Sequence, residues 1–370
     1  MGIRDKEEKT MILFRADGNK YIGSGHVMRC LSIADYAKST EENCVFLMAS
    51  ADLKEVVGNH GHQAIVYDTD YKSMMDDIIL TRKWVEEYRP EILFVDSYFV
   101  SEEYLRTLKQ VCEGVGTKLV YIDDLLKFSY PCDVLLNYNI YALDRKDEYS
   151  KIYRESDVPK MLLGPSYAPL RSEFRVTGDR KVKRNAENIL VSTGGADSEH
   201  VALKLAKRIV CYRDNLKGLQ FHFVLGAMNE DADIIRTLAK VSPLLVVHSN
   251  VRMMSKLMRK CDLAVSAAGS TLYELCATQT PTITYILANN QIPGAEGFER
   301  HGIMRCVGDC RTLGADGLME LLIKESVALA HNYEERRRIA VRQKSVVDGR
   351  GVARILKGAQ HVSSTHNKKI

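Results

Sequence analysis

Short runs of apolar, β-forming residues alternate with longer amphipathic stretches along this chain, and this alternation limits the folds open to it. The runs in the first half, such as "MILFRA" and "EILFVDS", are almost continuously apolar, and amphipathic stretches such as 27–39 and 101–113 lie between them. Strands that are buried on both faces of a parallel sheet have this character. We therefore predict a doubly wound α/β sheet, with strands at 11–16, 44–49, 64–68, 91–97, 118–124 and 134–139.

The alternation stops at residues 175–187 and then starts again. This segment, "RVTGDRKVKRNAE", is polar and basic and has no apolar periodicity, so it is the best linker in the chain. We predict an N-terminal Rossmann-like domain over 11–177, a C-terminal one over 186–328, and a helical tail over 329–360 with a solvated basic face. Two such domains facing a cleft would offer a ligand the carboxyl ends of both sheets. The strands predicted in the second domain are 188–195, 219–226, 243–249, 262–269 and 282–287.

Composition argues against several classes of protein. The 370 residues carry a formal net charge of only +4, and no basic run is interleaved with aromatics, so we expect no nucleic-acid partner. No apolar run reaches the roughly 18 residues that a membrane-spanning helix needs, and the charged N-terminus lacks the apolar core of a signal peptide. Nine cysteines without a Cys-x-x-Cys pair fit a reducing compartment, so we expect a cytoplasmic protein. His301, Cys306 and Cys310 could ligate a metal but are better explained as packed side chains, and we expect neither metal nor cofactor.

A glycine-containing turn follows the first predicted strand. In "IGSGHVMRCLSIAD", Gly23 and Gly25 allow a sharp bend and leave room for a ligand, and a helix begins near His26. The start of a helix offers unpaired N–H groups and partial positive charge, which suit an anion. A neutral histidine at this position could act as a general base. The alternative is a structural turn with an incidental histidine.

A second candidate site lies in "VSAAGSTLYELCATQTPTI". Small residues from Ser266 to Ser270 lead from a strand into a helix, whose first N–H groups can hold a diphosphate. Glu274 lies one turn into that helix. It could reach a sugar hydroxyl, or it could simply be a carboxylate that the helix dipole stabilises.

Other polar residues also follow predicted strands. Asp96, Ser97 and Tyr98 come at the end of the run 91–97, and the amides of "ANNQ" at 288–291 follow the run 282–287. The segment 190–198 contains a glycine turn, with Asp197 or Ser198 as the N-cap of the next helix. Amides in "VLLNYNIYA", together with Tyr167 and Arg171, close the first domain. A plain strand-to-helix turn explains the segment 190–198 about equally well, and buried amides such as those that close the first domain are often only loop ties.

Taken together, these motifs resemble those of a known family. The segments concerned are "LFRADGNKYIGSGHVMRCLSIA", "IDD", "CDVLLNYNIYA", "LGPSYAPLRSEF", "STGGAD" and "SAAGSTLYELCATQTPTI". Over about residues 11–330 the chain is similar to the UDP-2,4-diacetamido-2,4,6-trideoxy-β-L-altropyranose hydrolases of pseudaminic acid biosynthesis. That family is similar in turn to the lipid-intermediate glycosyltransferase of peptidoglycan synthesis, which has the GT-B fold. Spore-coat polysaccharide proteins share the same pattern.

The resemblance implies a GT-B fold and a metal-independent hydrolysis, in which water attacks the anomeric carbon of a UDP-sugar and His26 takes the proton from that water. The tail is expected to pack back on the N-terminal domain, and the uracil is expected near 248–254. The expected sugar-site residues are Asp17, Gly23, Gly25, Tyr98, Asn139, Tyr167, Arg171, Asn290 and Gln291. The expected UDP-site residues are Gly194, Val251, Met254, Ser266, Ala268, Gly269, Ser270 and Glu274.

Other functions stay open at this point. A glycosyltransferase would pass the sugar to a hydroxyl other than that of water, and a nucleotide-sugar-binding protein would catalyse nothing. A nicotinamide oxidoreductase is disfavoured, because no Gly-x-Gly-x-x-Gly follows the first strand. The expected partner is a UDP-sugar, without nucleic acid or a membrane span. The sequence does not decide the oligomeric state, although it favours a monomer.

Overall fold

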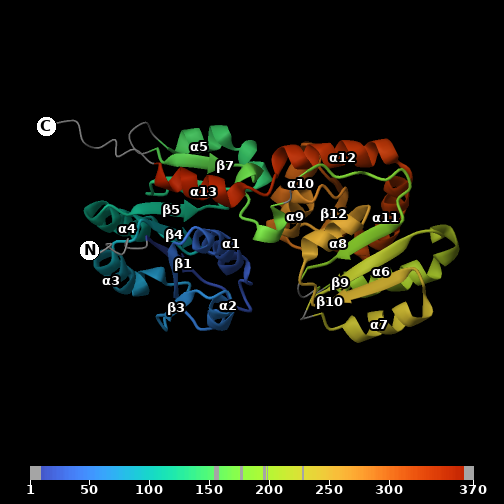
Figure 1. Cartoon of the computed structure of the whole chain (residues 1–370), viewed down its shortest axis with the longest axis horizontal. Coiled ribbons are helices and arrows are strands. Elements are labelled where there is room, and N and C mark those ends of the chain that lie inside the picture. The colour runs from blue at the N-terminus through green and yellow to red at the C-terminus, as the bar shows by residue number, and fades with distance from the viewer. Residues whose placement is uncertain are drawn as a thin grey trace, which may run out of the picture. The chain divides into compact units, whose positions relative to one another are not determined.

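The two halves of the chain each fold around a parallel β-sheet of their own. The computed structural model describes residues 10–153, 158–175, 178–194, 197, 199–226 and 229–361. One unit, unit 1, combines the residues up to Ser172 with those from Arg350 onward, and the other, unit 2, runs from Glu173 to Gly349. Figure 1 labels the elements of both units. The predicted class, two Rossmann-like α/β domains, is confirmed.

Unit 1 contains a seven-stranded sheet in the order β3-β2-β1-β4-β5-β6-β7, in which all neighbouring strands are parallel. All the strands predicted for this half are present. The sequence does not predict β7, because its four residues form a partly exposed edge strand without a long apolar run. The strands are β1 (Met11–Ala16), β2 (Asn43–Met48), β3 (Gln63–Val66), β4 (Ile92–Asp96), β5 (Lys118–Ile122), β6 (Val134–Asn137) and β7 (Lys160–Leu163).

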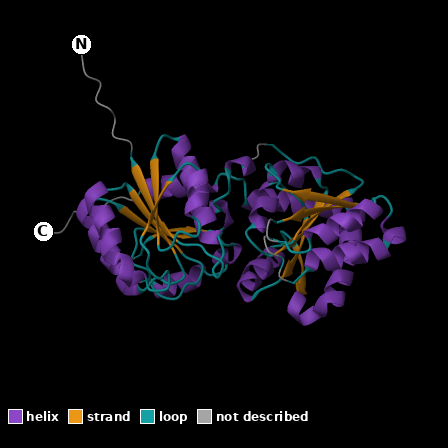
Figure 2. Cartoon of the chain, turned by 90° about the horizontal axis from the view of Figure 1, so that it is seen from below, coloured by secondary structure: helices purple, strands orange, loops and turns teal. Residues whose placement is uncertain are grey.

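Helices cover both faces of this sheet (Figure 2). On one face, α1 (Gly25–Ser39) and α13 (Gly351–Gln360) pack against each other. There Phe14 stacks between Phe46 and Phe94, with ring centroids 4.9 and 5.1 Å away. On the other face, α3 (Ile78–Tyr88) and α4 (Glu102–Val115) pack together. The shorter helices are α2 (Lys54–Asn59), α5 (Lys146–Ile152), η1 (Met74–Asp77), η2 (Ile140–Leu143) and η3 (Pro165–Tyr167).

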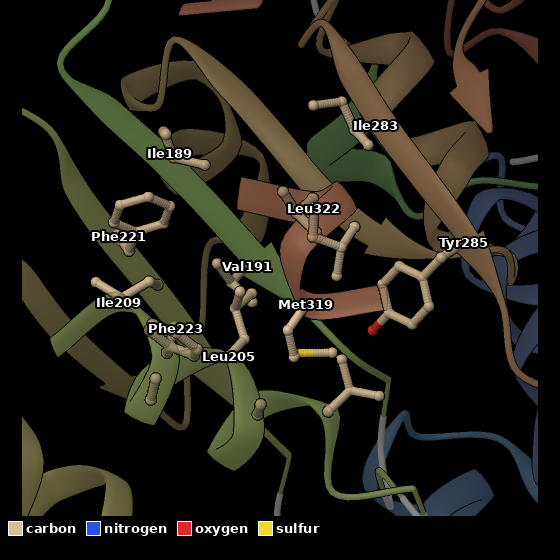
Figure 3. Packing of buried hydrophobic residues seen from close by; sticks show 14 of the residues in the cluster. Ile189, Val191, Leu205, Ile209, Phe221, Phe223, Ile283, Tyr285, Met319 and Leu322 are labelled. Carbon is tan, nitrogen blue, oxygen red and sulfur yellow. The ribbon is translucent and has the colours of Figure 1, made fainter. Parts of the chain in front are cut away.

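Unit 2 contains a six-stranded parallel sheet in the order β10-β9-β8-β11-β12-β13. The sequence misses only β13, an edge strand of half-buried residues. Figure 3 shows side chains of β8, β9 and β12 packed against α6 and α11, among them Val191, Phe223, Tyr285 and Met319. The strands are β8 (Asn188–Ser192), β9 (Gln220–Leu225), β10 (Leu245–Ser249), β11 (Leu263–Ala267), β12 (Thr282–Ile286) and β13 (Arg305–Asp309).

The helices of unit 2 connect these strands in the right order for a doubly wound sheet. The α-helices are α6 (Val201–Cys211), α7 (Ala232–Val241), α8 (Met254–Lys260), α9 (Thr271–Ala277), α10 (Ile292–Arg300), α11 (Cys310–His331) and α12 (Tyr333–Val346). The 3-10 helices are η4 (Ser172–Phe174, at the border with unit 1), η5 (Arg213–Leu216) and η6 (Asn289–Gln291).

The C-terminal tail is divided between the units, which corrects the prediction that 329–360 packs as one segment on the N-terminal domain. α11 and α12 pack together in unit 2, and α12 also contacts α9. The side chain of Asn332 accepts a hydrogen bond from the N–H of Glu335 (3.0 Å), so α12 begins as a separate helix. Only α13 packs on unit 1, beside β5, β6 and β7 (Figure 1).

The predicted linker is attached to unit 2. Arg180 donates hydrogen bonds to the carbonyl oxygen of Met258 (3.3 Å) and to the hydroxyl of Thr280 (3.0 Å), and burial lowers the pKa of its guanidinium to about 10. Arg336 of α12 donates to the carbonyl oxygens of residues 183 and 184, both at 2.8 Å. The chain therefore enters unit 2 after Ser172, ahead of most of the basic run.

Two neighbouring strands of unit 2 bring together a pair of histidines. His222 Nδ1 lies 2.9 Å from His248 Nε2, and His222 Nε2 lies 2.8 Å from Asn188 Oδ1. Burial, followed by the charges of His248 and Lys260, lowers the pKa of His222 to about 4. His222 is therefore a neutral, hydrogen-bonded part of the folded sheet above that pH.

We predict that Gly351→Ala lowers the free energy of unfolding by about 1–3 kcal/mol, because overpacking forces the backbone to shift. A Cβ at Gly351 would lie 2.2 Å from the carbonyl oxygen of Ala168. The control is Gly114→Ala in α4, where a Cβ meets nothing within 4 Å. This control should raise the free energy of unfolding by about 0.5–1 kcal/mol. Urea denaturation measures both, and an unchanged Gly351 variant would contradict the close approach of α13.

We predict that the free energy of unfolding falls as the pH is lowered from about 6.5 to about 4. The unfolded chain binds a proton at His222 near pH 6.5, whereas the folded chain binds it only near pH 4. The slope from this residue is at most about 1.4 kcal/mol per pH unit. His222→Gln should flatten the slope, and His331→Gln, which lies outside the pair, should not. Equal slopes for wild type and His222→Gln would contradict this prediction.

Candidate active site

The carboxyl ends of the strands in unit 1 carry a cluster of polar and charged side chains. The winding of the sheet reverses between β1 and β4, and doubly wound sheets bind ligands outside the strand ends at such a point. The segments that supply the cluster follow or end four neighbouring strands, and they are 17–29, 96–98, 123–124 and 137–139.

The glycine turn places His26 at the start of α1. Gly23 has a φ of 73°, in the left-handed region that favours glycine. The N–H of Asn19 donates to the carbonyl oxygen of Gly23 (3.2 Å), and the Asn19 side chain accepts from the N–H of Tyr21 (2.8 Å), so the loop is tied internally. The helix begins at Gly25, as predicted, and His26 is only 5% exposed. A Cβ at Gly23 or Gly25 would meet no atom within 4 Å, so space beside this turn is open.

His26 forms a dyad with Asp96, the last residue of β4. The Nδ1 atom of His26 lies 2.6 Å from Oδ1 of Asp96. Because a carboxylate can only accept a hydrogen bond, Nδ1 carries the proton and Nε2 carries the lone pair. The ring of Tyr98 stands edge-on to the imidazole, with centroids 4.4 Å apart. The dyad therefore gives His26 the tautomer that a general base needs.

Arg29, one turn after His26 in α1, bridges two carboxylates. Its Nε and Nη2 donate to the two oxygens of Asp96, each at 2.5 Å, and its Nη1 donates to Oδ2 of Asp124 at 2.9 Å. Burial alone would raise the pKa of the Asp96 carboxyl. The charge of Arg29, together with the hydrogen bonds from Arg29 and His26, outweighs burial and holds that pKa well below its ordinary value. Asp96 is therefore a carboxylate at neutral pH.

Asp124 connects this dyad to two residues predicted at the sugar site. The hydroxyl of Tyr98 donates to Oδ2 of Asp124 (3.1 Å), and Nδ2 of Asn139 donates to Oδ1 (2.7 Å). Burial, then the charge of Asp124, raises the pKa of Tyr98, so its hydroxyl stays protonated. The structure thus brings Tyr98 and Asn139 into one network with His26.

Asp17, which was predicted at the sugar site, pairs with Arg15 inside unit 1. It is buried, its Oδ2 lies 2.5 Å from Nη1 of Arg15, and its Oδ1 accepts from the N–H of Ala49 (2.7 Å). Arg15 also pairs with buried Asp77 at 2.6 Å. Both oxygens of Asp17 thus have partners inside unit 1 that hold the side chain in place, and its role at the sugar site stays a prediction.

Tyr167 and Arg171 lie at the end of unit 1, in and after η3. The helix α13 packs against η3. Their predicted role at the sugar site stays a prediction.

The carboxyl ends of the strands in unit 2 carry the residues predicted to bind UDP. There the winding reverses between β8 and β11. Gly194, which follows β8, has a φ of 89°. Ser266 is buried within β11 and its hydroxyl donates to the carbonyl oxygen of Ala267 (3.0 Å), and its predicted place at the UDP site stays a prediction.

The segment between β11 and α9 is short and tightly bonded. The N–H of Ala268 donates to the carbonyl oxygen of Tyr285 (2.9 Å) and that of Gly269 to Ala267 (2.8 Å). A diphosphate at this turn would therefore meet the N–H groups of Ser270 and Thr271. Ser270 is exposed, and half-buried Glu274 lies one turn further on.

The remaining predicted residues flank this turn. Val251 and Met254 lie between β10 and the first turn of α8, and Met254 is buried. Asn290 and Gln291 lie in η6 after β12, where the Gln291 side-chain oxygen accepts from the N–H of Leu287 (2.9 Å) and Asn290 is exposed. The roles of Val251 and Met254 at UDP and of Asn290 and Gln291 at the sugar stay predictions.

The glycine turn after β8 lies partly outside the described residues, and Ser198 is one of those outside. Asp197 does cap the following helix, because its carboxylate accepts from the N–H groups of Val201 (3.0 Å) and Ala202 (2.8 Å). The residue directly before α6 is His200, so the cap reaches the helix from three residues further back.

In the part of the chain that the structure describes, no three His, Cys, Asp or Glu side chains are arranged to hold a metal ion, and Cys306 and Cys310 are free thiols. No helix in the described ranges is long and apolar enough to cross a membrane.

Sequence reasoning missed Arg29 and Asp124. Both leave a signal that is visible only with the fold in hand. Arg29 lies three residues after His26 and so shares its helix face, while Asp124 directly follows β5, next to β4 in the sheet. Asp96 was noticed at the end of its strand, but not as the partner of His26.

The comparisons with known proteins support the resemblance that the motifs indicated. No known family profile matches the chain. It is 29% identical to a Helicobacter pylori protein named pseudaminic acid cytidylyltransferase and UDP-2,4-diacetamido-2,4,6-trideoxy-β-L-altropyranose hydrolase, over 65% of this chain and 42% of that protein. It is 26% identical to the Campylobacter jejuni protein named as that hydrolase alone, over 71% of this chain and 86% of the relative.

Two further relatives extend the comparison. The chain is 23% identical to the spore coat polysaccharide biosynthesis protein SpsG of Bacillus subtilis, over 92% of this chain and 95% of that protein. It covers 55% of an uncharacterized protein of Methanocaldococcus jannaschii. The chain thus spans about half the length of the Helicobacter and Methanocaldococcus relatives.

Solved structures show the fold. MurG of Acinetobacter baumannii matches with a TM-score of 0.61 and 12% identity, over 95% of this chain and 99% of that one. The calicheamicin glycosyltransferase CalG4 matches with a TM-score of 0.60 and 12% identity, over 96% and 100%. The chain therefore has the two-domain GT-B fold of these glycosyltransferases, and its sequence is similar to the UDP-diacetamido-trideoxy-altropyranose hydrolases.

Proposed function

We propose that this protein hydrolyses a UDP-linked 2,4-diacetamido-2,4,6-trideoxy hexose to the free sugar and UDP, in pseudaminic acid biosynthesis. The observation that carries the proposal is the His26–Asp96 dyad at the carboxyl ends of β1 and β4. The Helicobacter and Campylobacter relatives, named as hydrolases of such a UDP-sugar, supply the substrate class. The dyad supplies the chemistry.

In the proposed reaction, His26 acts as the general base. Water attacks the anomeric carbon, the bond from that carbon to the diphosphate oxygen breaks, and UDP leaves with the bonding electrons. The proton of the water passes to Nε2 of His26. Asp96 accepts the Nδ1–H throughout and stabilises the imidazolium that forms, as a carboxylate partner of histidine does.

Tyr98 and Asn139 are proposed to hold the sugar beside this base. Both lie in the hydrogen-bond network of Asp124, and Tyr98 contacts the imidazole ring. The open space at Gly23 and Gly25 allows the sugar to approach the backbone. A substrate held this way would present its anomeric carbon to a water on Nε2, and positioning of that kind is a large part of catalysis.

Unit 2 is proposed to bind UDP. Its candidate residues follow β8 and β11 on either side of the point where the winding reverses. We assign the diphosphate to the N–H groups of Ser270 and Thr271, the ribose to Glu274 and the uracil to the region 248–254. Asn290 and Gln291 are assigned to the donor sugar.

We place the reaction in the cytoplasm and favour a monomer. All nine cysteines are free thiols, which fits a reducing compartment.

The proposal is tested by incubating the protein with the UDP-diacetamido sugar in ¹⁸O-labelled water. We expect free UDP and free sugar in equal amounts, with the label in the sugar, because water attacks carbon. Label in UDP would mean that water attacks phosphorus, and the role of His26 would have to be abandoned. Release of UDP only when a hydroxyl acceptor is added would identify a glycosyltransferase instead.

His26→Asn is the matched variant for this reaction. General-base help is worth about 10²–10⁴ in rate, so kcat should fall by that order while UDP affinity stays nearly the same. The control is His60→Asn, a partly exposed histidine of unit 1 that pairs with Asp35 and lies outside the cluster. A His26 variant with wild-type kcat would remove the dyad from the mechanism.

We predict that Glu274→Ala weakens UDP binding by roughly 10- to 150-fold while the protein stays folded. Loss of one hydrogen bond to a charged group costs about 1.5–3 kcal/mol. Isothermal titration with UDP measures the change, and Glu320→Ala on α11 is the control. Unchanged affinity for UDP in the Glu274 variant would show that the ribose lies elsewhere.

A further inference from the structure

Arg29 is held by two carboxylates beside the His26–Asp96 dyad. Three of its nitrogens are engaged by carboxylates, with Asp96 accepting at both oxygens and Asp124 accepting from Nη1. Nη1 also donates to the hydroxyl of Tyr138 at 3.2 Å. The side chain is 10% exposed, so this charge lies within the protein, 3.1 Å from Nδ1 of His26.

Arg29 offsets part of the negative charge around His26. Asp96 and Asp124 are two carboxylates in a nearly buried cluster, and Arg29 is the cation between them. The same oxygen of Asp96, Oδ1, accepts from both His26 Nδ1 and Arg29 Nη2. An uncompensated carboxylate at 2.6 Å would favour the doubly protonated imidazole, which cannot take a proton from water.

We propose that Arg29 is a positioning residue of this site, which offsets one of the two negative charges of Asp96 and Asp124 and so weakens their tendency to keep Nε2 of His26 protonated. The inference rests on the proposed function only in naming water as the source of the proton that Nε2 accepts. The compensation itself is a property of the four side chains.

The other titratable groups that face His26 do not supply this compensation. Tyr98 packs on the ring, Tyr138 contacts Arg29, and Cys30 of α1 donates to Asp96 at 3.7 Å. Burial is the main reason that the pKa of each of these three groups is raised. All three are neutral at working pH, so Asp96, Asp124 and Arg29 set the charge near the base.

The geometry also explains why the cation is an arginine. The guanidinium is planar and offers its Nε and Nη2 to one carboxylate while Nη1 points to another. A lysine ammonium could neutralise charge but could not span both carboxylates in one fixed plane. Arg29 therefore fixes the orientation of Asp96, and through Asp124 the orientation of Tyr98 and Asn139, in addition to offsetting charge.

The first test compares pH–activity curves of wild type, Arg29→Gln and Arg29→Lys. A charge at this distance shifts a titration by about one to three pH units, so the acidic midpoint of the kcat curve should move upward by at least about one unit in Arg29→Gln. Arg29→Lys should keep the midpoint near that of wild type but lower kcat, since charge remains and geometry is lost. Arg82→Gln, which removes an exposed arginine paired with Glu86, should change neither.

Asp124→Asn tests the same idea with Arg29 in place. Removing one carboxylate leaves the cation to Asp96 alone, so the midpoint should move to lower pH. Circular dichroism on each variant shows whether it is folded. A folded Arg29→Gln whose kcat falls while its midpoint stays at the wild-type value would overturn the proposal, and so would an Asp124→Asn midpoint that rises.

A second measurement does not depend on the reaction. The protein with ¹⁵N-labelled histidine has ten imidazoles, and the His26→Asn spectrum identifies the signals of His26. In Arg29→Gln, the NMR titration of His26 should move to higher pH in step with the kcat midpoint. If no UDP-sugar is hydrolysed but the NMR shift appears, the proposed function fails and the role of Arg29 stands. If hydrolysis occurs and the His26 signal does not move, the role of Arg29 fails.

Discussion

Parallel strands that end at one edge determine where chemistry can occur in this protein. In unit 1 the dyad, the bridging arginine and the second carboxylate come from segments that are far apart in sequence and follow β1, β4 and β5. The strand register also brings these segments together. Asp96 pairs with Ala16, the last residue of β1, which directly precedes the loop that leads to His26. A side chain that follows a strand is therefore already close to its neighbours before any particular hydrogen bond forms.

Much of the fold can be predicted from the apolar runs, and the strands that this pattern fails to predict have a common physical cause. Buried central strands show nearly continuous hydrophobicity, which is why β1, β4 and β11 are easy to predict. The edge strands β7 and β13 are partly exposed, so their residues need not be apolar and the pattern fades. The linker and tail were misplaced because polar residues there are bound by specific long-range contacts. Arg180 and Arg336 attach a segment to unit 2 that composition alone presents as free.

Some features of the site can be predicted from residue type, and others depend on the hydrogen-bond partners that the fold supplies. Asp17, Asp96 and Asp124 are all aspartates at or just after a strand end, and their local sequences do not separate them. In the structure Asp17 pairs with Arg15, whereas Asp96 accepts a hydrogen bond from Nδ1 of His26. The sequence could therefore name His26, Tyr98 and Asn139, which the structure brings into one network at the carboxyl ends of the strands. It could not predict which acid orients the histidine, because that depends on β-sheet neighbours and on rotamers.

The dyad by itself does not distinguish water from another acceptor. Any hydroxyl placed on Nε2 of His26 could lose its proton to the same base, and the fold is shared with the calicheamicin glycosyltransferase CalG4. What distinguishes the reactions is the group that reaches the anomeric carbon first. A hydrolase needs only a water-sized space beside a neutral base, whereas a transferase must also bind a second substrate there. The nearly buried dyad, with the residues proposed for the sugar site hydrogen-bonded around it, provides the base that the simpler requirement calls for.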